Sequence, residues 1–333
     1  YPLIDGVVNG CPSHLLEPTR LQKIQYSEAF DNAYWTKSGS SVVSGFTSPK
    51  GDLSAFKLVE GTGTAGHSVF RNSSTVTLSS HSFSCFVKTN GRNVKLDFFG
   101  GTNNAIFDLA NGTVISANGT GLTAKIETLS NGWYRCSIMQ VQTSTTIYPN
   151  ILCVDDSNDS TYTGNGTSGV YIFGAQVEQS SFPTSYIPNY GTALGVTRSA
   201  ETASNSGDAS TFNDSEGVLF WEGNYFEDKQ GNGRRIGIFN SDTSIINRLV
   251  LTVGDVLGQI RVYFQGNNAF KSLTYVPQNI LENMKIAIYY DSINCKMIIN
   301  GFEVDSDTVG DLFIGLDTLR FAGLGGANHF EGN

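Results

Sequence analysis

The fold class is decided by the stretch Ser82-Phe83-Ser84-Cys85-Phe86-Val87-Lys88. Successive side chains of a β-strand point to opposite faces, so Phe83, Cys85 and Val87 would lie together on one face. Aromatic and β-branched residues such as phenylalanine and valine favour the pleated, half-buried surface of a sheet. The stretch therefore predicts a β-strand whose apolar face lies in a core.

Runs of this kind recur along the whole chain at intervals of about ten residues, which is the spacing of β-sandwiches. Asn-Gly, Gly-Gly, Asp-Ser and Ser-Gly pairs separate them, and these residue types favour turns. We therefore expect an all-β protein made of antiparallel sandwiches, with a short helical turn only at Gln278–Asn283. The expected strands are Ala55–Glu60, Ser82–Lys88, Val94–Phe99, Ala124–Leu129, Trp133–Gln142, Ile147–Val154, Gly169–Gln179, Gly217–Tyr225, Arg235–Asn240, Arg248–Val253, Gln259–Gln265, Met284–Asp291, Lys296–Ile299 and Asp317–Phe321.

Charge and cysteine content exclude several classes of protein. The 333 residues carry 21 Lys and Arg against 30 Asp and Glu, a formal net charge of −9. The sequence contains no cluster of Lys and Arg, and nucleic-acid binding through phosphate neutralisation needs a basic face. No run approaches the ~20 apolar residues of a membrane span. The five cysteines form no C-x-x-C pair, so we expect neither a disulfide framework nor a zinc site, and we interpret four of them as buried thiols.

The length suggests two domains, at about 150 residues per domain. Three of the eight prolines fall within residues 1–20, and proline fixes φ and removes a hydrogen-bond donor, so this segment predicts an extended arm. The apolar alternation stops between Asn189 and Asp214. We therefore expect an N-terminal arm at 1–20, a first sandwich at 21–190, a linker at 191–214 and a second sandwich at 215–333.

Two loops match ligand-binding patterns only in part. Gly61-Thr62-Gly63-Thr64-Ala65-Gly66 matches G-x-G-x-x-G, but a dinucleotide site needs this loop to open a helix, and no helical period follows. Asp155-Asp156-Ser157-Asn158-Asp159 is rich in oxygen ligands, yet Ser160 and Gly166 stand where an EF-hand needs Gly and Glu. We interpret the first as a strand connection. The second is a solvated loop in our interpretation, with an irregular Ca²⁺ site as the alternative; we expect no other cofactor and no other metal.

A third pattern concerns catalysis. Alternation would place Glu303, Asp305 and Asp307 on one side of a strand, and carboxylates about 5–5.5 Å apart can perform retaining glycoside hydrolysis. The Asn300-Gly301 pair directly before them is typical of a tight hairpin, so we expect the carboxylates to line the solvent face after the turn. No H-E-x-x-H or G-x-S-x-G element is present. We therefore expect a protein without catalytic residues.

Several segments in the first half carry a family resemblance. They are Leu15–Arg20 followed by Tyr26–Lys37, then Asn131–Ser137, and finally Gly174–Pro188 with Thr197–Glu201. Together they resemble the carbohydrate-binding-module-like jelly roll of tail, fibre and other virion proteins of bacteriophages. The resemblance covers roughly residues 15–201, and it implies a β-sandwich on the surface of a virion.

Other segments in the second half carry a second resemblance. Gly217–Glu222, Asn283–Ile288, Met297–Gly301 and Leu319–Gly323 are similar in strand order to the concanavalin A-like or laminin G-like lectin sandwich. Such sandwiches normally finish with one more strand, whereas this chain stops at Phe330-Glu331-Gly332-Asn333. The resemblance therefore implies a second sandwich that is incomplete at its C-terminal end.

Together the resemblances imply a structural or adhesive virion protein, such as a tail fibre, head fibre or capsid decoration, that binds host surface glycans. We expect it to form a homo-oligomer and to contact other virion proteins, with the arm packed on its own domain or on a neighbouring subunit. One alternative is a glycan depolymerase of a tailspike, acting as a glycoside hydrolase or lyase, which would need Glu303 and Asp305 in a cleft. The other alternative is an architectural virion protein without a ligand.

Sugar binding needs aromatic faces for the apolar side of the ring and polar groups for its hydroxyls. Our candidates for these contacts are Trp35, Trp133, Arg135 and Tyr148. Each also has a structural interpretation: Trp133 suits a sandwich core, Arg135 could pair with a nearby carboxylate, and Trp35 and Tyr148 could pack between strands.

Overall fold

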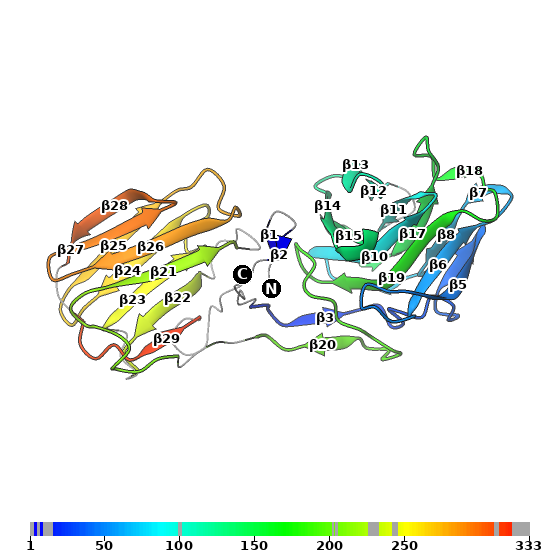
Figure 1. The fold of residues 1–333 in the computed structure, drawn as a ribbon. Coiled ribbons are helices and arrows are strands. Elements are labelled where there is room, and N and C mark those ends of the chain that lie inside the picture. The colour runs from blue at the N-terminus through cyan, green and yellow to red at the C-terminus, as the bar shows by residue number, and fades with distance from the viewer. Residues whose placement is uncertain are drawn as a thin grey trace. The chain divides into compact units, whose positions relative to one another are not determined.

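The computed structural model describes residues 3–4, 7–8, 16–98, 102–201, 203, 206–225, 233–241, 246–309 and 313–321. These residues form β-strands, with one short 3₁₀ helix, η1 (Ser130–Gly132), which confirms the all-β prediction (Figure 1). Within the described residues no helix has the length and apolar content that a membrane crossing requires. The chain divides into two compact units, which we call the first sandwich (Thr19–Arg198) and the second sandwich (Tyr1–Pro18 with Ser199–Asn333).

The first sandwich contains two antiparallel six-stranded sheets. In spatial order, one sheet consists of β14 (Thr123–Thr128), β15 (Tyr134–Val141), β10 (Ser80–Asn90), β19 (Gly169–Glu178), β6 (Ala55–Glu60) and β5 (Ser40–Phe46). The other consists of β13 (Thr113–Asn118), β12 (Asn104–Asp108), β11 (Asn93–Asp97), β17 (Asn150–Val154), β8 (Ser68–Phe70) and β4 (Thr36–Ser38). Three short pairs complete the unit: β9 (Ser74–Thr75) with β16 (Thr146–Ile147), β7 (Thr64–Gly66) with β18 (Thr161–Thr163), and β3 (Arg20–Gln22) with β20 (Val196–Arg198).

The core of the first sandwich follows the alternation of its strands. Phe83, Cys85 and Val87 on β10 are fully buried, as the sequence predicts. Cys85 lies opposite Cys136 on β15, and Cys153 and Cys295 are likewise buried and free. The thiol prediction is therefore confirmed for these four cysteines, whereas Cys11 lies outside the described residues.

The second sandwich contains a four-stranded and a five-stranded antiparallel sheet. The four-stranded sheet consists of β21 (Gly217–Gly223), β26 (Met284–Tyr290), β27 (Asn294–Ile299) and β28 (Phe302–Thr308). The five-stranded sheet consists of β25 (Phe270–Tyr275), β24 (Ile260–Gln265), β23 (Arg248–Val253), β22 (Arg234–Phe239) and β29 (Thr318–Arg320). Residues 322–333 lie outside the described residues, so the expectation that the second sandwich is incomplete at this end stays a prediction.

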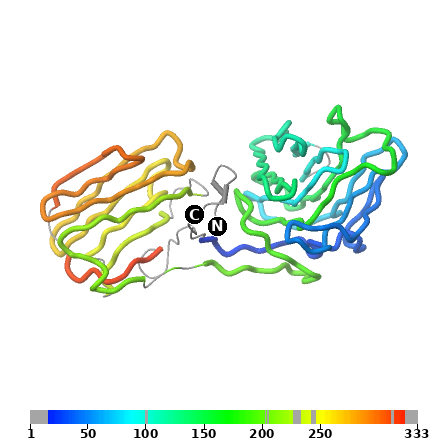
Figure 2. Tube along the Cα trace, viewed as in Figure 1, coloured from blue at the N-terminus to red at the C-terminus, as the bar shows by residue number. Residues whose placement is uncertain are grey.

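Short strands occur within the expected N-terminal arm and within the expected linker. β1 (Leu3–Ile4) pairs with β2 (Val7–Val8), and Leu16 is buried in the core of the second sandwich. The units divide at 18/19 and at 198/199, the latter within the expected linker 191–214. Figure 2 shows residues 20–22 of β3 in blue beside residues 196–198 of β20 in green. The chain therefore passes between the two units twice.

The expected helical turn at Gln278–Asn283 is wrong. This segment forms bends and a turn instead, and the side-chain Oδ1 of Asn279 accepts a hydrogen bond from the backbone N–H of Leu281 at 3.0 Å. The Gly61–Gly66 loop leads from β6 into β7, so it is the strand connection that we expected.

Candidate functional site

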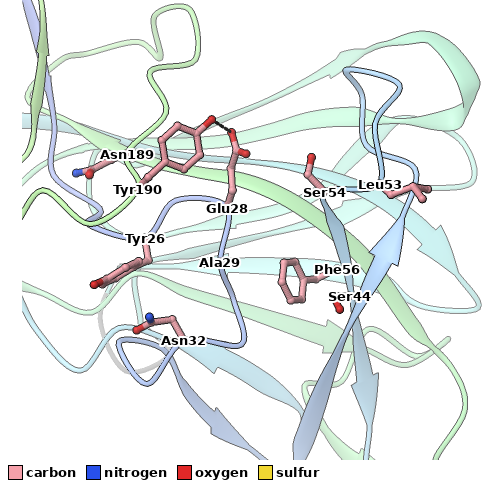
Figure 3. Close-up of a pocket in the computed structure, with 10 residues that line it drawn as sticks. All are labelled: Tyr26, Glu28, Ala29, Asn32, Ser44, Leu53, Ser54, Phe56, Asn189 and Tyr190. Atoms are coloured by element: carbon pink, nitrogen blue, oxygen red, sulfur yellow. Dashed lines mark hydrogen bonds between the residues drawn. The ribbon is translucent and has the colours of Figure 1, made fainter.

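A shallow hollow with a volume of about 410 Å³ lies in the first sandwich, between two loops, the edge strand β5 and its neighbour β6. Figure 3 shows Tyr26, Asn189 and Tyr190 on one side and Ser44, Leu53, Ser54 and Phe56 on the other. We call it the tyrosine hollow, and its lining is Tyr26, Glu28, Ala29, Asn32, Ser44, Leu53, Ser54, Phe56, Asn189 and Tyr190.

Ser27 ties the two loops of the hollow together. Its backbone N–H donates to the carbonyl of Asn189 at 3.0 Å, and its hydroxyl accepts the N–H of Asn189 at 2.8 Å. The same hydroxyl lies 2.7 Å from that of Tyr186. Tyr26, directly before Ser27, and Tyr190, directly after Asn189, form an antiparallel bridge. Two tyrosines that are more than 160 residues apart in the chain therefore lie opposite each other.

Trp35 packs under the loop that contains Tyr26 and holds its backbone. Its side chain is 1% exposed, and its Nε1–H donates to the carbonyl of Tyr26 at 2.8 Å. Its ring lies 5.1 Å from that of Phe30, which in turn packs 5.9 Å from Phe56. Our expectation that Trp35 contacts sugar is therefore wrong, because its ring faces are covered by the core.

Glu28 is the central charged group of the hollow. This residue is 8% exposed, and its carboxylate accepts a hydrogen bond from the Tyr190 hydroxyl at 3.4 Å (Figure 3). It also accepts a hydrogen bond from Lys50 Nζ at 3.2 Å. Partial burial and the adjacent carboxylate raise the pKa of Tyr190. The hollow thus presents a carboxylate acceptor directly beside a phenol.

The rim is apolar and open to solvent. Tyr190 is 70% exposed and Leu53 on the opposite side is 71% exposed. The amide of Asn189 has a structural role, because its Oδ1 accepts the N–H groups of Gly191 and Thr192. Chemically, the hollow offers exposed aromatic and aliphatic surface around a partly paired carboxylate, and this combination suits a ligand with both apolar faces and hydroxyl donors.

The other three expected contact residues do not lie in this hollow. Trp133 is 3% exposed and packs with Ala55 and Phe173 in a separate small cluster. Burial again covers the ring, so Trp133 is a packing residue and our expectation of a sugar contact is wrong.

Arg135 and Tyr148 are half-buried. The guanidinium of Arg135 lies 5.3 Å from the ring of Phe86 and donates to the Ser84 hydroxyl at 3.0 Å. Tyr148 donates its backbone N–H to the carbonyl of Phe98 at 2.7 Å. The structure does not bring the four expected residues together. Tyr26, Glu28 and Tyr190 lie in or directly after the segments that carry the jelly-roll resemblance, and this position was the available sequence signal for them.

A one-residue irregularity separates the three carboxylates of β28. Asn300 and Gly301 have φ of 51° and 88°, as a tight two-residue hairpin requires, but a bulge follows between Met297 and Ile298. Opposite residues of an antiparallel pair share a face, so Glu303 points outward with Ile298. Asp305 points to the core side, opposite the buried Met297. Our expectation that all three carboxylates share one face is therefore wrong.

The contacts of these carboxylates follow this division. Glu303 pairs with Lys296 at 2.9 Å and lines a second hollow, of about 500 Å³, on the outer face of the four-stranded sheet. Asp305 accepts the backbone N–H of Thr274 at 2.7 Å, and Asp307 pairs with Lys271 at 3.0 Å, so both bridge to β25 of the other sheet. Glu303 and Asp305 therefore do not line a common cleft.

In the Asp155–Asp159 loop, the side chain of Asp155 accepts hydrogen bonds from the backbone of the loop itself. Oδ1 of Asp155 accepts the N–H groups of Ser157 and Asp159 at 3.0 and 2.8 Å. Among the residues that the structure describes, no three His, Cys, Asp or Glu side chains gather as a metal site would need. The loop thus uses Asp155 to form a turn.

Comparison with solved structures yields likenesses at low similarity. No family model and no curated protein matches the chain. Among solved structures, domains LG4-5 of the mouse laminin alpha1 chain match with 11% sequence identity and a TM-score of 0.28, over 100% of this chain and 92% of that one.

Proposed function

We propose that this protein is an adhesion component on the surface of a bacteriophage particle, and that the tyrosine hollow binds a host surface glycan without cleaving it. The phage assignment is supported by the sequence resemblance of residues 15–201. The binding assignment is supported by the geometry of the hollow, where Tyr26 and Tyr190 lie opposite each other beside the Glu28 carboxylate. This juxtaposition is the observation on which the proposal depends.

The chemistry of the hollow suits a sugar ring. An exposed phenol face can stack against the C–H side of a ring, while a carboxylate accepts hydrogen bonds from ring hydroxyls. Ser27 and Trp35 hold the backbone of the loop before any ligand binds, which reduces the entropy lost on binding. The open rim buries little ligand, so we expect a dissociation constant of about 10 μM to 1 mM for a single site.

Weak single sites suit a particle that displays many copies. Repeated copies raise the effective concentration of the second binding event, and avidity then exceeds the affinity of one site. We propose a homo-oligomer that contacts other virion proteins, since many copies on one particle would supply this avidity.

The proposal can be tested with an array of bacterial surface polysaccharides, followed by titration of any glycan that binds. Tyr190→Ala removes the exposed ring, and we expect about tenfold weaker binding, equivalent to about 1.4 kcal/mol. Glu28→Gln should weaken binding while leaving the ring in place. Leu194→Ala is the control, because Leu194 is exposed in the same unit but does not line the hollow. Unchanged affinity in both hollow variants would contradict the assignment of this site.

The same polysaccharides also distinguish the two alternative functions. Release of reducing sugar ends that disappears in Glu303→Gln would favour the depolymerase, whereas Glu303 and Asp305 lie on opposite sides of β28. An array without any signal, combined with normal incorporation into particles, would favour an architectural protein.

A further inference from the structure

The outer face of the five-stranded sheet carries four arginines that the sequence does not show as a cluster. Side chains alternate along each strand, so Ile236, Leu249 and Val262 point into the core of the second sandwich. The residues between them point outward. One arginine comes from each of four strands, β22, β23, β24 and β29, and we call this surface the arginine face: Arg235, Arg248, Arg261 and Arg320.

The register brings these four residues into one patch. Arg235, Thr252 and Arg261 lie side by side across β22, β23 and β24. Gly237, two residues after Arg235 on β22, lies opposite Arg320 on β29. A further two residues along β22, Phe239 lies opposite Arg248, which in turn lies opposite Gln265 on β24. Neighbouring strands are ~4.8 Å apart, so the four strands of the patch span about 15 Å.

The positive charge of the patch is poorly balanced. Arg235 lies 3.4 Å from the carboxylate of Asp255. Arg248 donates two hydrogen bonds to the side-chain oxygen of Gln265, at 3.2 and 2.9 Å, and Arg261 donates to the neutral oxygens of Tyr263 and Gln259.

The guanidinium of Arg320 lies 5.6 Å from the ring of Phe239. Within the described part of the chain, Arg248, Arg261 and Arg320 have no carboxylate within ion-pair distance. Burial and the nearby positive charge of Arg235 lower the pKa of Arg248, which is the expected effect of uncompensated positive charge.

The patch also holds polar atoms without partners. The Nε atoms of Arg235, Arg261 and Arg320 are buried without an acceptor in the described residues. The hydroxyl of Thr252, which is fully buried between Arg235 and Arg261, likewise has no partner there. Buried polar groups are normally hydrogen-bonded, so part of the hydrogen-bonding capacity of this face is unused within the described residues.

We propose that the arginine face is a second binding site, independent of the tyrosine hollow, for the anionic groups of an acidic polysaccharide. The planar guanidinium presents two parallel N–H donors, which match a carboxylate or a phosphate in a bidentate manner. Beside the arginines, Tyr263 stacks 5.5 Å from Phe270, which is 51% exposed, and this pair offers an apolar platform for the sugar ring. A net charge of −9 disfavours long contacts with nucleic acid, whereas a local patch suits one or two acidic sugars.

The test uses the full chain and three polymers of matched length: a polyuronate, a phosphorylated mannan and neutral dextran. We expect binding to at least one charged polymer and none to dextran, and the preferred polymer identifies the anion as carboxylate or phosphate. Binding should weaken as NaCl rises from 50 to 300 mM, because salt screens exposed charges. Equal binding of dextran, or no binding of either charged polymer, would overturn the proposal.

Substitutions then locate the site. Arg261→Gln and Arg248→Gln should each weaken binding about tenfold, whereas Arg261→Lys, which retains the charge but loses the planar fork, should have an intermediate effect. Lys285→Gln on the four-stranded sheet is the matched control for the loss of one positive charge. Tyr190→Ala should leave this binding unchanged, so failure of this proposal is distinguishable from failure of the tyrosine hollow. Unchanged binding in the arginine variants, or equal binding of a single-stranded oligonucleotide, would contradict the assignment.

Discussion

Replacing Trp35 by Phe tests whether Trp35 supports the loop of the tyrosine hollow or contacts the glycan. The indole is almost fully buried, and its N–H donates to the carbonyl of Tyr26 at 2.8 Å. Phenylalanine retains most of the packing against Phe30, but it cannot donate this hydrogen bond. We therefore expect the variant to lose stability and to retain a largely intact tyrosine hollow.

The magnitude follows from the groups that lose their partners. A buried carbonyl left without its donor costs about 1–3 kcal/mol, and the smaller ring leaves a void that adds to this cost. We take about 2 kcal/mol as the central value. For a unit of this size, each kcal/mol lowers the melting temperature by about 2–4 °C, so we expect a decrease of about 4–8 °C.

The assay combines thermal unfolding, followed by circular dichroism, with glycan binding well below the melting temperature. Tyr190→Phe is the control, because its exposed hydroxyl makes only a 3.4 Å hydrogen bond and should change the melting temperature little. A Trp35→Phe variant with unchanged melting temperature and lost glycan binding would refute the reasoning, since that result is expected of a surface contact residue.

Three further predictions concern stability and connectivity. Burial alone would raise the pKa of Glu60, but hydrogen bonds from Arg92 and neighbouring groups outweigh burial and lower this pKa below its ordinary value of 4.5. The ionised carboxylate therefore stabilises the fold above pH 4.5, and this stabilisation is lost as pH falls through the lowered pKa. Urea unfolding between pH 3 and 6 should show this loss, and Glu60→Gln should flatten the curve; a parallel curve in the variant would contradict the role of Glu60. A proteolytic nick within 199–214 should leave the two fragments associated on size exclusion, because Leu16 belongs to the core of the second sandwich, and Leu16→Asp should release them. Gly301→Ala, at φ 88° with open space around it, should destabilise the second sandwich alone by about 1–2 kcal/mol, and an unchanged melting temperature would show that the turn tolerates a side chain.

Much of the local structure could be predicted because it depends on a few neighbouring residues. The alternation of Ser82–Lys88 predicts a strand, and Phe83, Cys85 and Val87 are indeed buried. The Asn300-Gly301 pair predicts the two-residue turn that the structure contains. Backbone preferences of this kind act between near neighbours in the chain, so the sequence alone predicts them.

The candidate site could not be predicted in the same way. Trp35 and Trp133 have the residue type that sugar binding needs, but only the packing of two layers determines that both rings are buried. Tyr26 and Tyr190 become neighbours because Ser27 and Gln25 bond across their loops to Asn189 and Gly191. Aromatic residue type alone does not distinguish a core residue from a surface residue.

By itself, then, the sequence determined the all-β class, the buried thiols in four strands and the two-residue turn before β28, because these features follow from local alternation and turn chemistry. The tertiary structure decided which residues meet. The bulge at Met297 and Ile298 places Glu303 and Asp305 on opposite faces, and strand register brings together arginines at 235, 248, 261 and 320. Register and layer packing depend on contacts between distant segments, and a shift of one residue moves a side chain to the other face of a sheet.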